Sequence, residues 1–232
     1  MKNRGKNYKD LVSKLEKDKL YDKEEAVKLV KELSKTKFDA TIDVAMNLNL
    51  DVKKADQQLR GALQLPHGTG KTSRILVIAK GDAAKDAKDA GADFVGDIDM
   101  LEKIEKENWF DFDVMIATPD MMPILGKYGK LLGPKGLMPN PKTGTVTTNV
   151  KKAVEDSKAG RVEYRTDTFG NIHGVVGKAS FTDKQLLENL DSFVKTILRL
   201  KPSTVKGTYV KNIAISGTMS PSIKIDINSF DN

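Results

Sequence analysis

The 232 residues include 39% hydrophobic and 31% charged side chains. A globular chain of this length buries about 70% of the surface that its unfolded form exposes, so the composition excludes disorder throughout. The absence of cysteine excludes disulfides and thiolate chemistry, and two histidines leave little for a histidine-based metal site. The 39 basic and 32 acidic residues give a net charge of +7, which favours a polyanionic partner such as nucleic acid. Lysine-rich codon usage is the alternative explanation, because only six of the basic residues are arginine.

Nothing in the sequence indicates a membrane partner. The longest apolar runs, such as residues 75–79, are far short of the roughly 18 residues that a membrane span needs. The basic N-terminus lacks the apolar stretch of a signal peptide. We therefore expect a soluble, cytoplasmic protein.

The first 50 residues predict helix followed by strand. Residues 7–35 are expected to be helical, and Asp22 to Glu25 have the spacing of a capping box. From Thr41 to Leu50, apolar residues alternate with small polar ones. This period of two predicts a strand with one buried face and one face that carries small polar groups.

The middle of the chain, residues 67–157, alternates short apolar runs with helical stretches. Strands are expected at 75–79, 94–95 and 112–117, and helices at 82–92, 98–107 and 149–159. This alternation is typical of a parallel, three-layer α/β domain. Thr118-Pro119 is a helix-start signal, and a loop rich in glycine, proline and lysine is expected at 126–145.

The last third returns to alternation. Strands are predicted at 162–164, 172–176, 208–216 and 222–227, the final two on either side of a turn at 217–221. Thr182 to Gln185 form a second capping box, and an amphipathic helix follows it and ends before Pro202.

The simplest organisation is a discontinuous α+β domain of residues 1–66 and 158–232, into which an α/β domain of residues 67–157 is inserted. The insert has 13 basic and 14 acidic residues, for a net charge of −1, and the remainder has 26 and 18, for +8. Codon usage alone would spread lysine evenly over the chain. The uneven distribution therefore favours a polyanionic partner for the discontinuous domain.

Residues 67–72, His-Gly-Thr-Gly-Lys-Thr, resemble a phosphate-binding loop but lack its context. Leu65 stands where the first glycine belongs, and the apolar strand follows the motif instead of preceding it. Without a helix N-terminus behind the loop, no phosphate site is expected. A flexible hinge between the domains is the preferred interpretation.

No catalytic residue, cofactor or metal site is predicted, and we do not expect an enzyme. His173 lies in a strand-like run, and no carboxylate pair stands out by its spacing. Two competing hypotheses stay open. A nucleotide-dependent enzyme built on the insert would bind ATP, and a protein-only scaffold would have no affinity for RNA at physiological salt.

Two segments suit contact with RNA. The first is Lys37 to Asp43, where Phe38 precedes the polar strand face that carries Thr41 and Asp43. An aromatic ring beside small hydrogen-bonding groups fits bases and ribose 2′-hydroxyls. The alternative is that Phe38 only seals the edge of the core.

The second segment is Ser216 to Pro221. Gly217 permits close backbone approach, Thr218 supplies a hydroxyl, and Met219 offers a flexible apolar surface. The alternative interpretation is an ordinary hairpin turn.

The run from Lys127 to Lys142, KYGKLLGPKGLMPNPK, is similar to the signature of the large-subunit ribosomal protein one family, the protein of the ribosome's mobile lateral stalk. Residues 37–41, 170–173 and 216–219 resemble further motifs of this family in the same order. The resemblance covers nearly the whole chain. It implies a discontinuous split βαβ domain with an inserted Rossmann-like three-layer α/β domain.

The resemblance also implies a function without catalysis. A member of this family binds rRNA of the lateral stalk in the large ribosomal subunit and assists release of deacylated tRNA from the exit site. Bacterial members also repress translation by binding the mRNA of their own operon. We expect a monomer when the protein is free.

The contact surface implied by the resemblance belongs to the discontinuous domain. Its residues are Lys37, Phe38, Thr41, Asp43, His173, Asn212, Ser216, Gly217, Thr218 and Met219. Asn212 is expected on the same strand face as Ser216. Two residues depart from the family pattern, since Ser220 replaces a usual glycine and Asp43 a common glutamate.

Further contacts are expected from lysine-rich segments. Gly133, Lys135 and Gly136 would form a second, weaker rRNA contact. Attraction to phosphates is expected from Lys2, Arg4, Lys6, Lys9 and Lys37.

Overall fold

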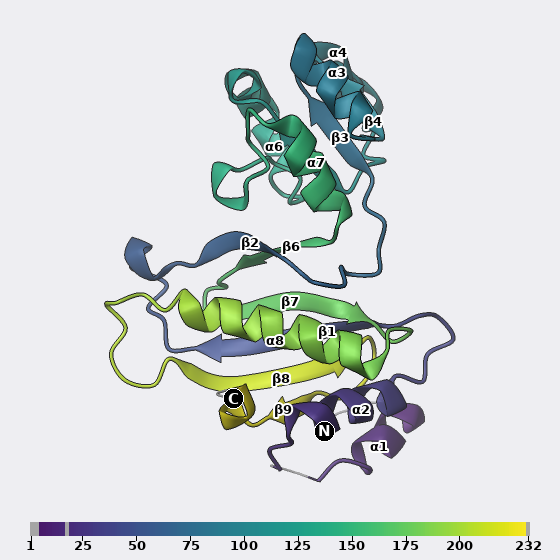
Figure 1. Cartoon of the computed structure of the whole chain (residues 1–232), viewed down its shortest axis with the longest axis vertical. Helices are drawn as coiled ribbons and strands as arrows, with labels where there is room; N and C mark the ends of the chain where they lie inside the picture. Colours follow the sequence, from purple (N-terminus) through teal and green to yellow (C-terminus); the bar gives the residue numbers. More distant parts are fainter. Residues whose placement is uncertain (1–4, 17–18, 231–232) are drawn as a thin grey trace. The chain divides into compact units, whose positions relative to one another are not determined.

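The computed structural model describes residues 5–16 and 19–230. The chain divides into two compact units (Figure 1). Unit 1 comprises residues 1–70 and 162–232, and unit 2 comprises residues 71–161. Each junction lies four residues beyond the predicted one. The first is shifted because residues 67 and 68 are hydrogen-bonded to a helix of unit 1. The second is shifted because a helix of unit 2 continues to Lys158. Both units mix helices and strands.

The main sheet of unit 1 is antiparallel and has the strand order β7-β1-β8-β9. These strands are β1 (Thr41–Leu48), β7 (Asn171–Lys178), β8 (Val210–Gly217) and β9 (Ile223–Ile225). Burial alternates along β1, as its period of two predicts, although the strand ends at Leu48 instead of Leu50. The four strands therefore have one buried face and one half-exposed face, which we call the open face.

Two helices pack on the buried face of this sheet, α2 (Lys23–Leu33) and α8 (Asp183–Arg199). Figure 1 shows α8 lying along the sheet. The predicted capping box of α8 is confirmed, with Thr182 accepting from the Gln185 amide and Gln185 accepting from the Thr182 amide. The predicted stripe of α8 is buried at Leu186, Leu190, Phe193, Val194 and Ile197.

The prediction of continuous helix over 7–35 is wrong. The structure has α1 (Lys6–Val12) and, separately, α2. Between them Tyr21 pairs with β9, donating its amide to the Lys224 carbonyl and accepting from the Asp226 amide. Tyr21 and its partners in β9 are about 200 residues apart in the sequence, so local periodicity gave no sign of this contact. Asp22 precedes α2 but makes no side-chain capping bond, so the predicted capping box is also wrong.

A second pair of strands in unit 1 was predicted only in part, since the sequence indicated the strand at 162–164 but not its partner at 60–64. β2 (Arg60–Gln64) pairs with β6 (Arg161–Arg165) in a two-stranded sheet. Apolar residues at 59, 63 and 65 have the spacing of a strand but are separated by residues with little strand preference. Short one-turn helices η1 (Ala55–Gln57) and η5 (Ile227–Phe230) complete this unit.

Unit 2 has a three-stranded parallel sheet in the order β4-β3-β5. Its strands are β3 (Ile75–Ile78), β4 (Phe94–Gly96) and β5 (Val114–Ala117). Helices α3 (Asp82–Asp89) and α7 (Val150–Lys158) share one core cluster, and α4 (Ile98–Glu107) lies in the other. These elements match the predicted ones except at their ends.

The segment expected to be a loop at 126–145 contains short helical turns. These are η3 (Gly126–Tyr128), α6 (Gly129–Leu132) and η4 (Pro141–Thr143), preceded by η2 (Pro119–Met121) and α5 (Met122–Leu125). Leu125 and Leu132 are buried in the core on the α4 side of the sheet. Their apolar spacing was hidden by the many glycines and prolines of the segment.

Candidate nucleic-acid interface

Strand register brings the predicted contact residues of three strands onto the open face. Asp43 in β1 lies opposite Ser216 in β8, and Asn47 lies opposite Asn212. On the other side of β1, His173 of β7 lies opposite Ala45. Because directly opposite residues of an antiparallel pair point to the same face, these side chains share one surface. Asn212 and Ser216 lie on one face, as predicted.

The threonine pair Thr41 and Thr218 joins the ends of two strands. The Thr218 amide donates to the Thr41 carbonyl over 2.9 Å. The Thr218 hydroxyl donates to the same carbonyl and accepts from the Thr41 amide, both over 3.2 Å. The Thr41 hydroxyl in turn accepts from Nζ of Lys178 over 2.7 Å. The Thr218 hydroxyl therefore fixes the position of the turn, in addition to any group that it offers to a ligand.

The turn after β8 presents Met219 to solvent. Met219 has φ +65° and is 76% exposed. The Ser220 hydroxyl accepts from the Gly217 amide over 2.8 Å and donates to the Gly217 carbonyl over 3.0 Å. Serine at this position therefore closes the turn by folding back on it. A Cβ at Gly217 would collide with Oγ of Ser34. The close approach that Gly217 permits is therefore to the Ser34 side chain of the same protein.

Phe38 stands at the entrance to β1 with 54% of its surface exposed. It therefore does not seal the core, and that alternative is wrong. Asp39 holds the segment in place, since its carboxylate accepts from the amide and hydroxyl of Ser180. The aromatic ring and the neighbouring Lys37 are thus exposed on a segment that Asp39 holds in place.

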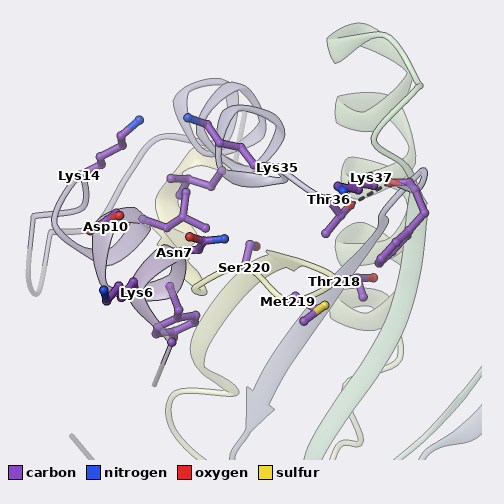
Figure 2. A pocket seen from close by; sticks show the side chains of 15 residues that line it. Lys6, Asn7, Asp10, Lys14, Lys35, Thr36, Lys37, Thr218, Met219 and Ser220 are labelled. Carbon is purple, nitrogen blue, oxygen red and sulfur yellow. Dashed lines mark hydrogen bonds between the residues drawn. The ribbon is translucent and has the colours of Figure 1, made fainter. Parts of the chain in front are cut away.

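A groove of about 1330 Å³ runs between α1 and the residues around Phe38 and Thr218 (Figure 2). Figure 2 shows Thr218, Met219 and Ser220 on one wall. Four lysines and one acidic residue are among its lining residues, namely Lys6, Lys14, Lys35, Lys37 and Asp10. We call it the α1 groove. Such an excess of lysine suits the phosphates of a nucleic-acid strand.

Sequence reasoning missed part of this groove. Asn7, Lys14 and Lys35 were not predicted, because the α1 helix was merged with α2 and its position could not be inferred. Of the predicted phosphate contacts, Lys6 lines the groove and Lys9 is exposed on α1. Lys2 and Arg4 lie outside the described residues.

One carboxyl of the open face has an altered affinity for protons. Burial raises the pKa of Asp43 above its usual value, and electrostatic interaction with Lys178 and His173 offsets this only in part. A half-buried carboxylate costs free energy that a hydrogen-bond donor on a ligand could offset.

The predicted second contact lies in unit 2. Gly136 has φ +72° and donates its amide to the Gly133 carbonyl over 3.0 Å, and this pair closes a turn. Nζ of Lys135 lies 3.4 Å from the centre of the Phe110 ring. The lysine is therefore held by a cation–π contact within its own unit.

Within residues 5–16 and 19–230, no three histidine or acidic side chains are grouped so that they could hold a metal ion. In the same ranges, no helix is long and apolar enough to cross a membrane.

A basic α/β chain that exposes an aromatic ring and lysines beside the small polar groups of a sheet face is typical of an RNA-binding protein. The ribosomal protein L1p/L10e family matches residues 30–221. A large ribosomal subunit protein uL1 from Phytoplasma australiense is 60% identical over 223 residues, covering 96% of this chain and 97% of the relative. Another from Mesoplasma florum is 56% identical over 224 residues, covering 97% and 98%. The chain belongs to the ribosomal protein L1p/L10e family.

This membership confirms the resemblance drawn from the 127–142 signature. It also confirms that the chain is a ribosomal protein and not an enzyme, which excludes the nucleotide-dependent enzyme.

Proposed function

We propose that the protein is a cytoplasmic component of the large ribosomal subunit that binds rRNA of the mobile lateral stalk through unit 1. One observation carries the assignment of the surface. Two segments 177 positions apart, around Thr41 and Thr218, are hydrogen-bonded to each other and expose Phe38 and Met219 beside the lysines of the α1 groove. The relatives named as large-subunit proteins support the site of assembly.

In this proposal two kinds of contact have different roles. Lysines of the α1 groove attract phosphates and make binding depend on salt. The open face and the 216–219 segment recognise sugar edges and the folded shape of the RNA. The loop at Gly133, Lys135 and Gly136 would add a weaker phosphate contact from unit 2.

Binding of the purified protein to a folded stalk rRNA fragment tests the proposal. The titration is run from low to high salt, with and without bulk competitor RNA. We expect tight binding that survives competition. Weak binding that is abolished by competitor would show that unit 1 binds polyanions without specificity. Absence of binding at physiological salt would favour the protein-only scaffold.

Thr218 provides a sharper test of the surface. Thr218→Val removes the hydroxyl that bonds to Thr41 at the edge of the α1 groove, so we expect a loss of about 1–3 kcal/mol in binding free energy. Thr218→Ser keeps the hydroxyl and should bind nearly as the parent protein does. Equal affinities for all three proteins would remove the hydroxyl from the site.

Two further roles follow from the resemblance and stay proposals. The ribosome-bound protein would assist release of deacylated tRNA from the exit site, which is tested by comparing release rates from ribosomes with and without it.

The free, monomeric protein would repress translation of its own operon by binding a similar fold in the mRNA. If one surface serves both RNAs, the rRNA fragment should displace the mRNA, and simultaneous binding would argue against it.

We also assign a split βαβ fold to the discontinuous domain and a Rossmann-like fold to the insert. The antiparallel sheet covered on one face by α2 and α8 supports the first assignment. The parallel order β4-β3-β5 with helices on both faces supports the second.

A further inference from the structure

Phe169 is the most exposed large hydrophobic side chain of the described residues, at 81%. It lies in the connection between β6 and β7, at the end of the open face away from Thr41. Thr41 and Asn47 are six residues apart in β1, which separates the two ends by about 20 Å. Of the contacts proposed above, Asn212 and His173 come near this end of the sheet, and none of them involves Phe169.

The loop that carries Phe169 is fixed. Oδ1 of Asp167 accepts from the amides of Phe169 and Asn171, both over 2.8 Å. Oδ2 accepts from the side-chain amide of Asn171 over 2.8 Å. Gly170 has φ +80°, and its carbonyl accepts from the Leu48 amide over 3.0 Å, which ties the loop to β1. The aromatic ring is therefore presented on a preorganised backbone.

Burial of the Asp167 carboxyl raises its pKa, but the hydrogen bonds from Asn171 and Phe169 outweigh this and lower the pKa below its usual value. The loop anchor therefore stays ionised through the neutral range.

A row of amides lies beside the ring. Asn171, Asn47 and Asn212 face one another across β7, β1 and β8. The Asn47 side-chain amide donates to Oδ1 of Asn171 over 2.5 Å. The Asn212 side chain makes no hydrogen bond to another described residue, although it is half-buried. Its side-chain donor and acceptor are therefore not used within the described chain.

The charge of unit 1 as a whole favours a polyanionic partner. Unit 1 has 24 basic and 18 acidic residues, for a net charge of +6. An exposed aromatic ring beside amides that donate and accept is the arrangement with which proteins hold an unpaired nucleotide. A pocket in a neighbouring protein could also receive Phe169, but it would not need the amide row or the positive unit.

We propose that Phe169 and the asparagine row form a second nucleotide-binding site, in which an unpaired base of the stalk rRNA stacks on the ring while Asn212 hydrogen-bonds to its edge or ribose. The proposal rests on the rRNA-binding function proposed above and extends it across the whole open face.

Four proteins test the site against the folded stalk rRNA fragment: the parent chain, Phe169→Ala, Phe169→Trp and the loop control Thr168→Ala. Loss of one base-stacking contact should weaken binding of Phe169→Ala by between about five- and 150-fold. The salt dependence should not change, because no cation is removed. Phe169→Trp and Thr168→Ala should bind as the parent does.

Fluorescence gives a readout that a change in folding would not produce. In Phe169→Trp, stacking should quench the new tryptophan when the fragment is added, beyond any change from Trp109 in the parent protein. If the parent binds specifically and Phe169→Ala binds equally well, the second site is wrong while the proposed function stands. The second site is equally wrong if Phe169→Ala binds the fragment normally but enters ribosomal subunits poorly, which would indicate a protein pocket. Absence of specific binding by the parent would instead overturn the proposed function.

Discussion

Met219 is held in a left-handed backbone conformation that side chains other than glycine rarely adopt. This conformation costs about 1–2 kcal/mol, and such strain persists mostly where the side chain has a use. The exposed thioether of Met219 gains nothing from the core. We therefore attribute its presence to contact with RNA.

Met219→Gly should consequently separate stability from binding. We expect the free energy of unfolding to rise by about 1 kcal/mol, because glycine relieves the strain, while affinity for the rRNA fragment falls. Urea denaturation and RNA titration measure the two effects. Met219→Ala is the matched control, since it removes the side chain but keeps the strain, and it should lose affinity without gaining stability. A gain in affinity for the glycine variant would contradict the assignment.

Asp43 predicts a pH-dependent stability. Its pKa is raised in the folded protein, so the folded state favours the protonated carboxyl. The resulting destabilisation is absent below the unfolded pKa of 3.8, develops as pH rises through the folded value, and is complete above it. Asp43→Asn should therefore raise the melting temperature at pH 7, and this gain should vanish near pH 3. A lower melting temperature at pH 7 would mean that attraction to Lys178 outweighs burial.

At the scale of elements, α8 carries a buried side chain that holds another segment. Asn189 is fully buried, and its Oδ1 accepts from the His67 amide over 3.0 Å. Its Nδ2 donates to the carbonyls of Gly68 and Val176 over 3.0 and 2.7 Å. The first two residues of the predicted hinge are thereby bound to α8, so that segment is less free than its glycines indicate.

Asn189→Leu should leave the buried Val176 carbonyl without its partner, together with the less buried His67 amide and Gly68 carbonyl. We expect the free energy of unfolding to fall by about 1–3 kcal/mol, the cost of one unsatisfied buried group, because water can reach the other two. Chemical denaturation monitored by circular dichroism gives the value. The exposed α8 variant Lys184→Gln should change it by less than about 0.5 kcal/mol. A similar small effect for Asn189→Leu would show that water replaces the amide.

The elements that the sequence predicted well are those whose pattern is local. The alternation of β1 and the stripe of α8 each follow from one buried face, and both were found with nearly correct ends. The break at Tyr21 depends on pairing with β9 about 200 residues away, so no local pattern reveals it. The α1 groove was missed for the same reason, since it exists only where α1 meets residues near 36 and 219.

At the scale of the whole molecule, charge is unevenly divided. Unit 1 carries +6, whereas unit 2 has 15 basic and 14 acidic residues. Long-range attraction to RNA should therefore act mainly on unit 1.

Lys37→Gln tests this attraction. Because the lysine lines the α1 groove, we expect weaker binding to every RNA alike and a salt dependence reduced by about one phosphate contact. Lys85→Gln on α3 is the control, since that lysine is exposed and paired with Asp82 in unit 2. Selective loss for one RNA with Lys37→Gln would assign the lysine to recognition instead.

The position of β1 in its sheet also sets an order of events during synthesis. Both neighbours of β1, namely β7 and β8, are encoded after the whole of unit 2. At about 5–20 residues per second, the ribosome needs on the order of ten seconds to pass from the first strand to its partners. Unit 2 is contiguous and can fold in that interval, whereas the open face cannot form until the chain is almost finished. A nascent or truncated chain therefore has no assembled RNA surface, and only completed copies can compete for rRNA.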